Sequence, residues 1–130
     1  MIDQLAILPW VTAVAVGGAL GGLLRHGVYI AIEHRRIPTL PISTLTVNLV
    51  GSLLIGFLVG LGRRELLDPF WVVLLVGGTC GAFTTFSSFM ADWLRLQRQG
   101  RRVLGVVYVV LTLVAGIGLA FIGMHAAGMV

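Results

Sequence analysis

The sequence contains four long stretches without Asp, Glu, Lys or Arg. They cover residues 5–24, 37–62, 69–91 and 103–130, and short charged segments separate them. A helix needs about 20 residues to cross about 30 Å of hydrocarbon, and each stretch reaches that length. We therefore expect an all-α integral membrane protein, with one transmembrane domain over residues 1–130 and helices at about 5–32, 41–62, 69–96 and 103–125.

The low charge content excludes most soluble functions. Charged residues make up 11% of the chain, whereas a soluble domain carries roughly 25%. All nine basic residues are arginine and most flank the uncharged stretches, so we interpret them as membrane-flanking charge rather than as a nucleic-acid surface. Cys80 is the only cysteine, so no disulfide can form within one chain. We expect a multi-pass membrane protein.

Arginines are distributed unevenly between the two ends of the expected bundle. Four spans place both termini on one side of the membrane, together with Arg63 and Arg64. The opposite side holds six arginines, which are Arg35, Arg36, Arg95, Arg98, Arg101 and Arg102. Because short arginine-rich loops tend to stay in the cytoplasm, this count favours both termini outside the cytoplasm.

The third stretch includes GGTCGAFTTFSSF at residues 77–89, where three glycines precede four clustered hydroxyl residues in an uncharged span. Glycine costs about 1 kcal/mol per helix position relative to alanine. Backbone groups that leave a helix inside a bilayer need partners from protein, ion or water. We therefore predict a broken third helix and a functional role for the break.

Polar residues recur at helical spacing in the second and fourth spans. Asn48 shares a face with Ser52, because residues four apart lie on one side of a helix. An asparagine at membrane depth needs hydrogen bonds, which leaves two roles for Asn48: a bond between helices, or a ligand to a passing solute. Tyr108 and Thr112 are also four apart, and Thr112 alone would be expected to bond its own backbone.

Two charged residues lie inside or close to a span. Arg25 costs a few kcal/mol in hydrocarbon unless it reaches water or a partner. It therefore either extends to the interface or attracts anions at a water-filled vestibule. Asp92 has three possible roles: pairing with an arginine such as Arg95, facing water at a helix end, or assisting transport.

Phe86 and Phe89 fall on one helical face if the third helix resumes after its break. Phenylalanines at this spacing usually face lipid or the core, but the neighbouring hydroxyl residues favour a second role. The edge of a phenyl ring carries positive potential, so a ring edge can face an anion without binding it tightly.

Small residues at four-residue spacing predict close packing between helices. The pairs are Gly17 with Gly21, Gly18 with Gly22, and Gly56 with Gly60. Four short helices enclose little volume, so a polar pathway forms more easily between subunits than within one. We therefore expect an oligomer, most simply a dimer.

Three segments resemble the Fluc or CrcB family of fluoride channels. GGALGGLLRH at residues 17–26 is similar to the family's Gly-Gly-x-x-Gly-Ala-x-x-Arg-Tyr motif. STLTVNLVGS at 43–52 resembles its second-helix asparagine segment, and GAFTTFSSF at 81–89 resembles its broken third helix. The resemblance implies a passive, selective channel in a bacterial inner membrane. Such a channel lets cytoplasmic fluoride leave the cell, which reduces fluoride toxicity, and it requires no catalytic chemistry.

The resemblance also implies an assembly and a set of site residues. The assembly is an antiparallel, dual-topology dimer, most simply a homodimer, with two pores and a structural Na⁺ at its interface. The backbone carbonyls of Gly81 and Thr84 would hold that ion, and Arg25 would line an entrance vestibule. The pore positions implied for fluoride are Asn48, Thr85, Phe86, Ser88, Phe89, Tyr108 and Thr112.

The chain departs from the family pattern at several positions. Gly22 and His26 replace an alanine and a tyrosine, Asp92 stands in place of a glutamate, and Gly116 stands where relatives carry a hydroxyl. The arginine bias is a further departure, because a subunit that inserts in both orientations should be nearly unbiased. Two assemblies therefore stay open: a homodimer, or a heterodimer with an oppositely oriented paralogue.

Two other classes of protein compete with the channel. A small proton-coupled multidrug exporter also has four short helices, but it needs a carboxylate in its first helix, and residues 5–24 contain none. A non-transporting membrane scaffold would need only the glycine faces. It would leave the clustered threonine, serine, asparagine and phenylalanine residues unexplained.

Overall fold

Four helical spans are long and apolar enough to cross a membrane. The computed structural model describes residues 4–33 and 40–129, and within these the spans are Ile7–Ile32, Ile42–Arg63, Pro69–Arg98 and Arg102–Ala127. No strand occurs in the described part of the chain. The expected all-α class with four spans is confirmed. The helix ends lie within one or two residues of the expected positions.

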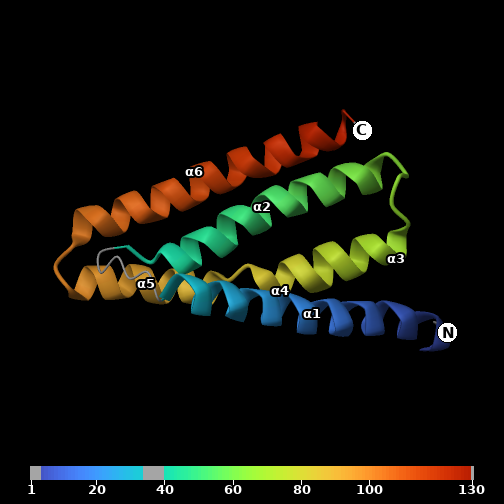
Figure 1. Ribbon diagram of the computed structural model, residues 1–130, viewed down its shortest axis with the longest axis horizontal. Coiled ribbons are helices and arrows are strands. Elements are labelled where there is room, and N and C mark those ends of the chain that lie inside the picture. Colours follow the sequence, from blue (N-terminus) through green and yellow to red (C-terminus); the bar gives the residue numbers. More distant parts are fainter. Residues whose placement is uncertain (1–3, 34–39, 130) are drawn as a thin grey trace.

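Three of the spans are continuous helices and the third is composite. The continuous ones are α1 (Gln4–Glu33), α2 (Ile42–Arg63) and α6 (Arg102–Ala127). The third span consists of α3 (Pro69–Val72), the π-helix η1 (Val73–Cys80), α4 (Gly81–Phe83) and α5 (Phe86–Arg98). Successive spans run in opposite directions, so the start of α1 and the end of α6 lie at the same end of the bundle (Figure 1).

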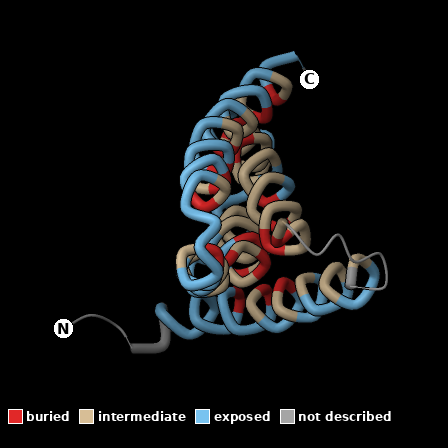
Figure 2. The backbone as a smooth tube through the Cα atoms, turned by 90° about the vertical axis from the view of Figure 1, so that its left-hand side faces the viewer, coloured by how far each residue is buried: buried red, intermediate tan, exposed pale blue. Residues whose placement is uncertain are grey.

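The spans pack as two pairs. Helix α2 lies along α6, while α1 lies along η1 and α4, and α5 contacts α6 (Figure 1). Buried positions are confined to the sides where helices meet, and the outer sides of α1 and α6 are exposed (Figure 2). Those outer sides are rich in Leu, Ile and Val, which is the surface expected for contact with lipid tails.

Glycines allow the close approach within each pair. A Cβ on Gly21 would overlap the carbonyl oxygen of Thr79, and one on Gly56 would overlap the carbonyl oxygen of Ala120. Close packing is thus confirmed for two of the predicted glycine pairs. The third pair differs, because a Cβ on Gly18 or Gly22 would meet no atom of the described chain within 4 Å.

The third helix is broken, but not at its glycines. Gly81 keeps right-handed helical angles (φ −60°, ψ −38°), and the π-helix before it is uninterrupted. The chain leaves the helix at Thr84 (φ −76°, ψ 158°) and Thr85 (φ −147°, ψ 118°). The predicted break in the third helix is therefore present, and it lies at Thr84 and Thr85, three residues after Gly81. Gly78 instead lets α1 approach closely, since a Cβ there would lie 2.9 Å from the Cα of Gly17.

Candidate functional site

The break in the third span is held by a side chain of α2. The Asn48 Oδ1 accepts the Thr85 backbone N–H at 2.8 Å, and the Asn48 Nδ2 donates to the Thr85 carbonyl at 3.1 Å. Thr85 is buried and extended, so its backbone groups need such partners. Of the two roles left open for Asn48, the bond between helices is present. The Nδ2 carries two hydrogens, and this contact uses one of them.

The same arrangement changes the partners of two backbone carbonyls. In an uninterrupted helix, Gly81 C=O would accept the Thr85 N–H, and Thr84 C=O would accept the Ser88 N–H. Here Asn48 takes the first N–H, and the Thr85 hydroxyl oxygen accepts the second at 3.2 Å. The carbonyls of Gly81 and Thr84 are thus the two whose helical N–H partners are bound by side chains.

A groove opens beside the break, between α2, the start of α5 and α6. Its volume is about 320 Å³. We call it the polar groove, and it is lined by Asn48, Ser52, Ile55, Thr84, Thr85, Phe86, Phe89, Thr112, Leu113, Gly116 and Ile117. Five of the seven pore positions implied by the resemblance therefore meet in one place, contributed by three spans. Ser88 and Tyr108 are not among the lining residues.

Phe86 and Phe89 face the polar groove with different exposure. Phe86 is 75% exposed and Phe89 is 5% exposed, although their ring centroids are only 6.0 Å apart. Phe89 also packs on the Tyr108 ring, with centroids 5.3 Å apart and planes inclined by 40°. Phe89 therefore belongs to both the core and the groove wall, whereas Phe86 projects outward from the start of α5.

The hydroxyl groups near the groove are already partly engaged. Thr112 Oγ1 donates to the Tyr108 carbonyl at 2.7 Å, which is the backbone bond expected for it alone. Thr85 Oγ1 donates to the Ser88 Oγ at 3.1 Å. A hydroxyl has one hydrogen to donate, so Thr112 and Thr85 would have to rotate before donating to an anion. Ser88 does not line the polar groove itself, but it accepts a hydrogen bond from Thr85, which does.

Ser52 was not predicted as a site residue, and it stands beside Gly116 in the polar groove. A Cβ placed on Gly116 would lie 3.3 Å from the Ser52 Oγ. A hydroxyl from α2 therefore lies next to the α6 position where a hydroxyl was expected to be missing. The four-residue spacing of Asn48 and Ser52 was the signal for this assignment.

A second polar cluster joins α1, α2 and α5 beyond the groove. The Thr44 hydroxyl donates to the Asp92 Oδ2 at 2.6 Å and lies 2.8 Å from the Tyr29 hydroxyl. The Asp92 Oδ1 pairs with the Arg95 Nη2 at 3.1 Å. Pairing with Arg95 is thus the role of Asp92 that the geometry supports. Tyr29 and Thr44 were not predicted, although Thr44 lies one helical turn before Asn48.

The Tyr108 side chain is fully buried and its hydroxyl is unsatisfied. Its relative exposure is 0%, and the hydroxyl oxygen has no hydrogen-bond partner in the part of the chain that the structure describes. A buried hydroxyl without a partner costs about 1–3 kcal/mol. Such a group is expected to serve a transient ligand or a water molecule.

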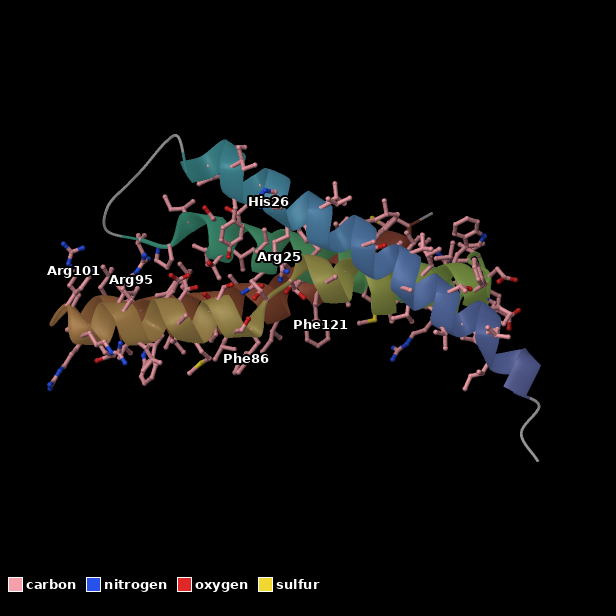
Figure 3. The ribbon with its side chains drawn as sticks, turned by 90° about the horizontal axis from the view of Figure 1, so that it is seen from below. Arg25, His26, Phe86, Arg95, Arg101 and Phe121 are labelled. Carbon is pink, nitrogen blue, oxygen red and sulfur yellow. The ribbon has the colours of Figure 1, made fainter. Side chains whose placement is uncertain are left out.

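Arg25 lies on α1, one helical turn beyond Gly21, and is half-buried. It projects from α1 on the side of the connection between α4 and α5 (Figure 3). Helix α1 packs along α4, and Gly21 approaches the Phe83 N–H closely. Arg25 therefore stands near the break rather than on the lipid-facing side of α1. Its assignment to a vestibule stays a prediction.

Side-chain ligands for a metal are not gathered anywhere in the described ranges, 4–33 and 40–129. No group of three or more His, Cys, Asp or Glu residues is close enough to hold an ion there. The Na⁺ site implied by the resemblance uses the backbone carbonyls of Gly81 and Thr84, whose helical N–H partners are bound by side chains here. This assignment stays a prediction.

Comparison with known proteins places these features in a family. Residues 12–124 match the sequence model of the family described as "CrcB-like protein, Camphor Resistance (CrcB)". A relative from Leptospira interrogans, named "Fluoride-specific ion channel FluC", is 40% identical over 111 residues, covering 85% of this chain and 87% of the relative. Relatives with the same name from Saccharophagus degradans and Chlorobium chlorochromatii are 39% and 37% identical, covering 89% and 98% of this chain and 86% and 96% of each relative.

Proposed function

The chain belongs to the CrcB-like family and is a channel for fluoride, and we propose that fluoride crosses the membrane along the polar groove. The observation that carries this proposal is the meeting of Asn48, Thr85, Phe86, Phe89 and Thr112 from three spans in one groove. No step of the process makes or breaks a covalent bond, so the protein is not an enzyme.

The chemistry of the polar groove suits a small, strongly hydrated anion. An ion leaving water needs its lost hydrogen bonds replaced at short distance. The second N–H hydrogen of Asn48 and the Ser52 hydroxyl are donors of this kind. The Thr85 and Thr112 hydroxyls become such donors once they rotate away from their present acceptors. The Phe86 and Phe89 ring edges add positive potential without a full charge. A larger halide would fit such short contacts poorly, which supports selectivity for fluoride.

A second copy of the chain is the proposed cover of the polar groove. In one copy the groove is open, and the adjoining Phe86 ring is 75% exposed. A polar groove open to lipid would leave its amide and hydroxyl groups without partners. Gly18 and Gly22 also present a glycine face with no neighbour within the described chain, and small-residue faces favour helix contact in membranes. These observations support an oligomer, and the family resemblance implies an antiparallel dimer with two pores.

Charge at the two ends bears on the identity of the second copy. Arg95, Arg98, Arg101 and Arg102 lie at the end of the bundle where α5 turns into α6, and Arg63 and Arg64 lie at the other end. Arg35 and Arg36 lie outside the described residues. A strongly biased subunit is expected to insert mainly one way, so the partner is either a copy inserted against this bias or an oppositely biased paralogue.

We propose that Gly81 and Thr84 hold a structural Na⁺ through their backbone carbonyls. The structure supports the fit, because both carbonyls lack the N–H partner that a continuous helix would supply. A hard cation prefers oxygen ligands and takes roughly six of them. One chain offers two carbonyls here, so a shared position between two copies would complete the ligand set better than a position within one.

The cellular role proposed for the channel is passive release of fluoride from the cytoplasm. Four apolar spans make the protein a multi-pass membrane protein, and we place it in the bacterial inner membrane by resemblance. The competing proton-coupled exporter lacks support, since α1 has no carboxylate among Ile7–Ile32.

A liposome assay tests the function directly. Purified protein is reconstituted with an outward fluoride gradient and a potassium shunt, and external fluoride is followed with an electrode. We expect rapid fluoride release and far slower chloride release in parallel vesicles. Equal slow leakage of both anions from vesicles that contain correctly folded protein would contradict a fluoride channel. Activity of this one chain would also show that it needs no paralogue.

A further inference from the structure

A second groove lies on the outer side of the bundle, between α5 and α6. Its volume is about 260 Å³. We call it the outer groove, and it is lined by Phe89, Met90, Trp93, Val106, Val109 and Val110. All six side chains are apolar or aromatic. In a bilayer this surface would be filled by hydrocarbon or by another protein, because water has no partners there.

The outer groove points toward a cation at the end of the bundle. Arg102 is the first residue of α6, and it lies one turn before Val106 and two turns before Val110. Residues at four-residue spacing share one face of a helix. Arg102 therefore stands above the groove, on the side where α6 reaches the membrane surface.

Other positive charges lie at the same end of the bundle as Arg102. Arg98 ends α5, Gly100 turns the chain with φ +74°, and Arg101 and Arg102 follow at once. All three arginines are exposed. The nearby acid, Asp92, already pairs with Arg95. In Figure 3, Arg95 and Arg101 lie at this same end of the bundle. The end of the bundle to which the outer groove leads therefore carries net positive charge.

We propose that the outer groove binds an anionic phospholipid, with its phosphate at Arg102 and an acyl chain along Trp93, Val106 and Val110. An apolar groove that ends at a cation at the membrane surface complements an amphiphile with an anionic head. Guanidinium groups bind phosphate oxygens through charge-assisted, often bidentate hydrogen bonds. Basic residues beside a membrane span also attract anionic lipids. Val103 is 79% exposed and Val106 is 55% exposed, so an acyl chain can reach the groove from the lipid side.

Tryptophan fluorescence gives a direct test, because Trp93 lines the outer groove. Trp10 and Trp71, which are 40% and 51% exposed, are replaced by phenylalanine so that Trp93 is the only reporter. The full chain is reconstituted in phosphatidylcholine vesicles that contain brominated phosphatidylglycerol or, in parallel, brominated phosphatidylcholine. We expect stronger quenching of Trp93 by the anionic lipid, with a preference of about fivefold for each arginine that contacts the phosphate.

Variants separate the head-group contact from the acyl contact. Arg102→Gln should lower the preference for the anionic lipid about fivefold, whereas the control Arg63→Gln, at the opposite end of the bundle, should leave it unchanged. Val110→Phe should fill the outer groove and reduce quenching by both lipids. Adding inorganic phosphate should change none of these results, because the site binds a lipid and not a free anion.

Three results would overturn the proposal. Equal quenching by both brominated lipids in the parent chain would show that the outer groove does not select an anionic lipid. An unchanged preference for the anionic lipid in Arg102→Gln would show that Arg102 does not bind the lipid phosphate. Absence of quenching by either lipid would show that protein covers the outer groove, as in an interface between copies. No fluoride gradient is used, so the result does not depend on whether the chain conducts fluoride.

Discussion

The side-chain amide of Asn48 pairs with both backbone polar groups of Thr85, accepting the N–H at 2.8 Å and donating to the carbonyl at 3.1 Å. This contact ties the extended break in the third span to α2. It also occupies the N–H that would otherwise bind the Gly81 carbonyl. The Asn48 side chain therefore stabilises the break and leaves the Gly81 carbonyl without its helical N–H partner. It also keeps one N–H hydrogen that can be donated in the polar groove.

Asn48→Ala should therefore reduce stability as well as fluoride flux. The substitution leaves the buried N–H and C=O of Thr85 without partners, at about 1–3 kcal/mol for each group. We expect a lower thermal unfolding temperature in detergent, with Thr46→Ala in the same helix as the matched control. An unfolding temperature equal to that of the parent would mean that Thr85 finds other partners and that Asn48 does not hold the break.

Phe86→Ile should suppress fluoride flux with little change in stability. Phe86 is 75% exposed in the single chain, so removing its ring leaves no internal cavity, but it does remove a ring edge from the polar groove. The matched control is Phe121→Ile on α6, which is 65% exposed and lies outside the lining of the groove. Liposome efflux measures both variants, and size-exclusion chromatography checks their assembly. Equal flux in Phe86→Ile and the parent would assign Phe86 to packing against lipid or a second copy.

Replacing Na⁺ by a large organic cation should destabilise the assembled protein if the Gly81 and Thr84 carbonyls hold the ion. An ion that binds only the folded state stabilises it by about 2.7 kcal/mol at a hundred times its dissociation constant. We expect the unfolding temperature to rise with NaCl, and to stay nearly constant with choline chloride at equal ionic strength. If the unfolding temperature depended on salt concentration in the same way for both salts, the Gly81 and Thr84 carbonyls would not bind Na⁺.

Sequence patterns predicted the spans well because hydrocarbon thickness and the absence of charge leave few alternatives. They located the break less well. Glycines at 77, 78 and 81 indicated weak helix propensity, yet in the structure Gly78 serves the close approach of α1. The break follows three residues after Gly81, where a partner for Thr85 exists on α2. Such a partner lies 37 positions away in the chain, so local propensity carries no information about it.

The candidate site was likewise predicted only in part from the sequence. Asn48, Phe86 and Phe89 were predicted from residue type at membrane depth and from the family resemblance, and the fold brings them to one groove. Tyr29 and Thr44 were missed because each is an ordinary residue in a helical span. They became visible only when the fold placed them in a chain of hydrogen bonds ending at Asp92. Residue type predicts which groups need partners, whereas the tertiary fold selects the partner.

Tyr108→Phe distinguishes a structural hydroxyl from a functional one by the sign of the stability change. The Tyr108 hydroxyl is buried and has no partner within the described residues. Removing an unsatisfied buried group relieves about 1–3 kcal/mol of desolvation, while the phenyl ring can keep its packing on Phe89. We expect an unfolding temperature equal to or above that of the parent, together with slower fluoride efflux if the pathway continues from the polar groove to this hydroxyl, as the family resemblance implies. Lower stability with unchanged efflux would show that the hydroxyl holds a structural water molecule and takes no part in conduction.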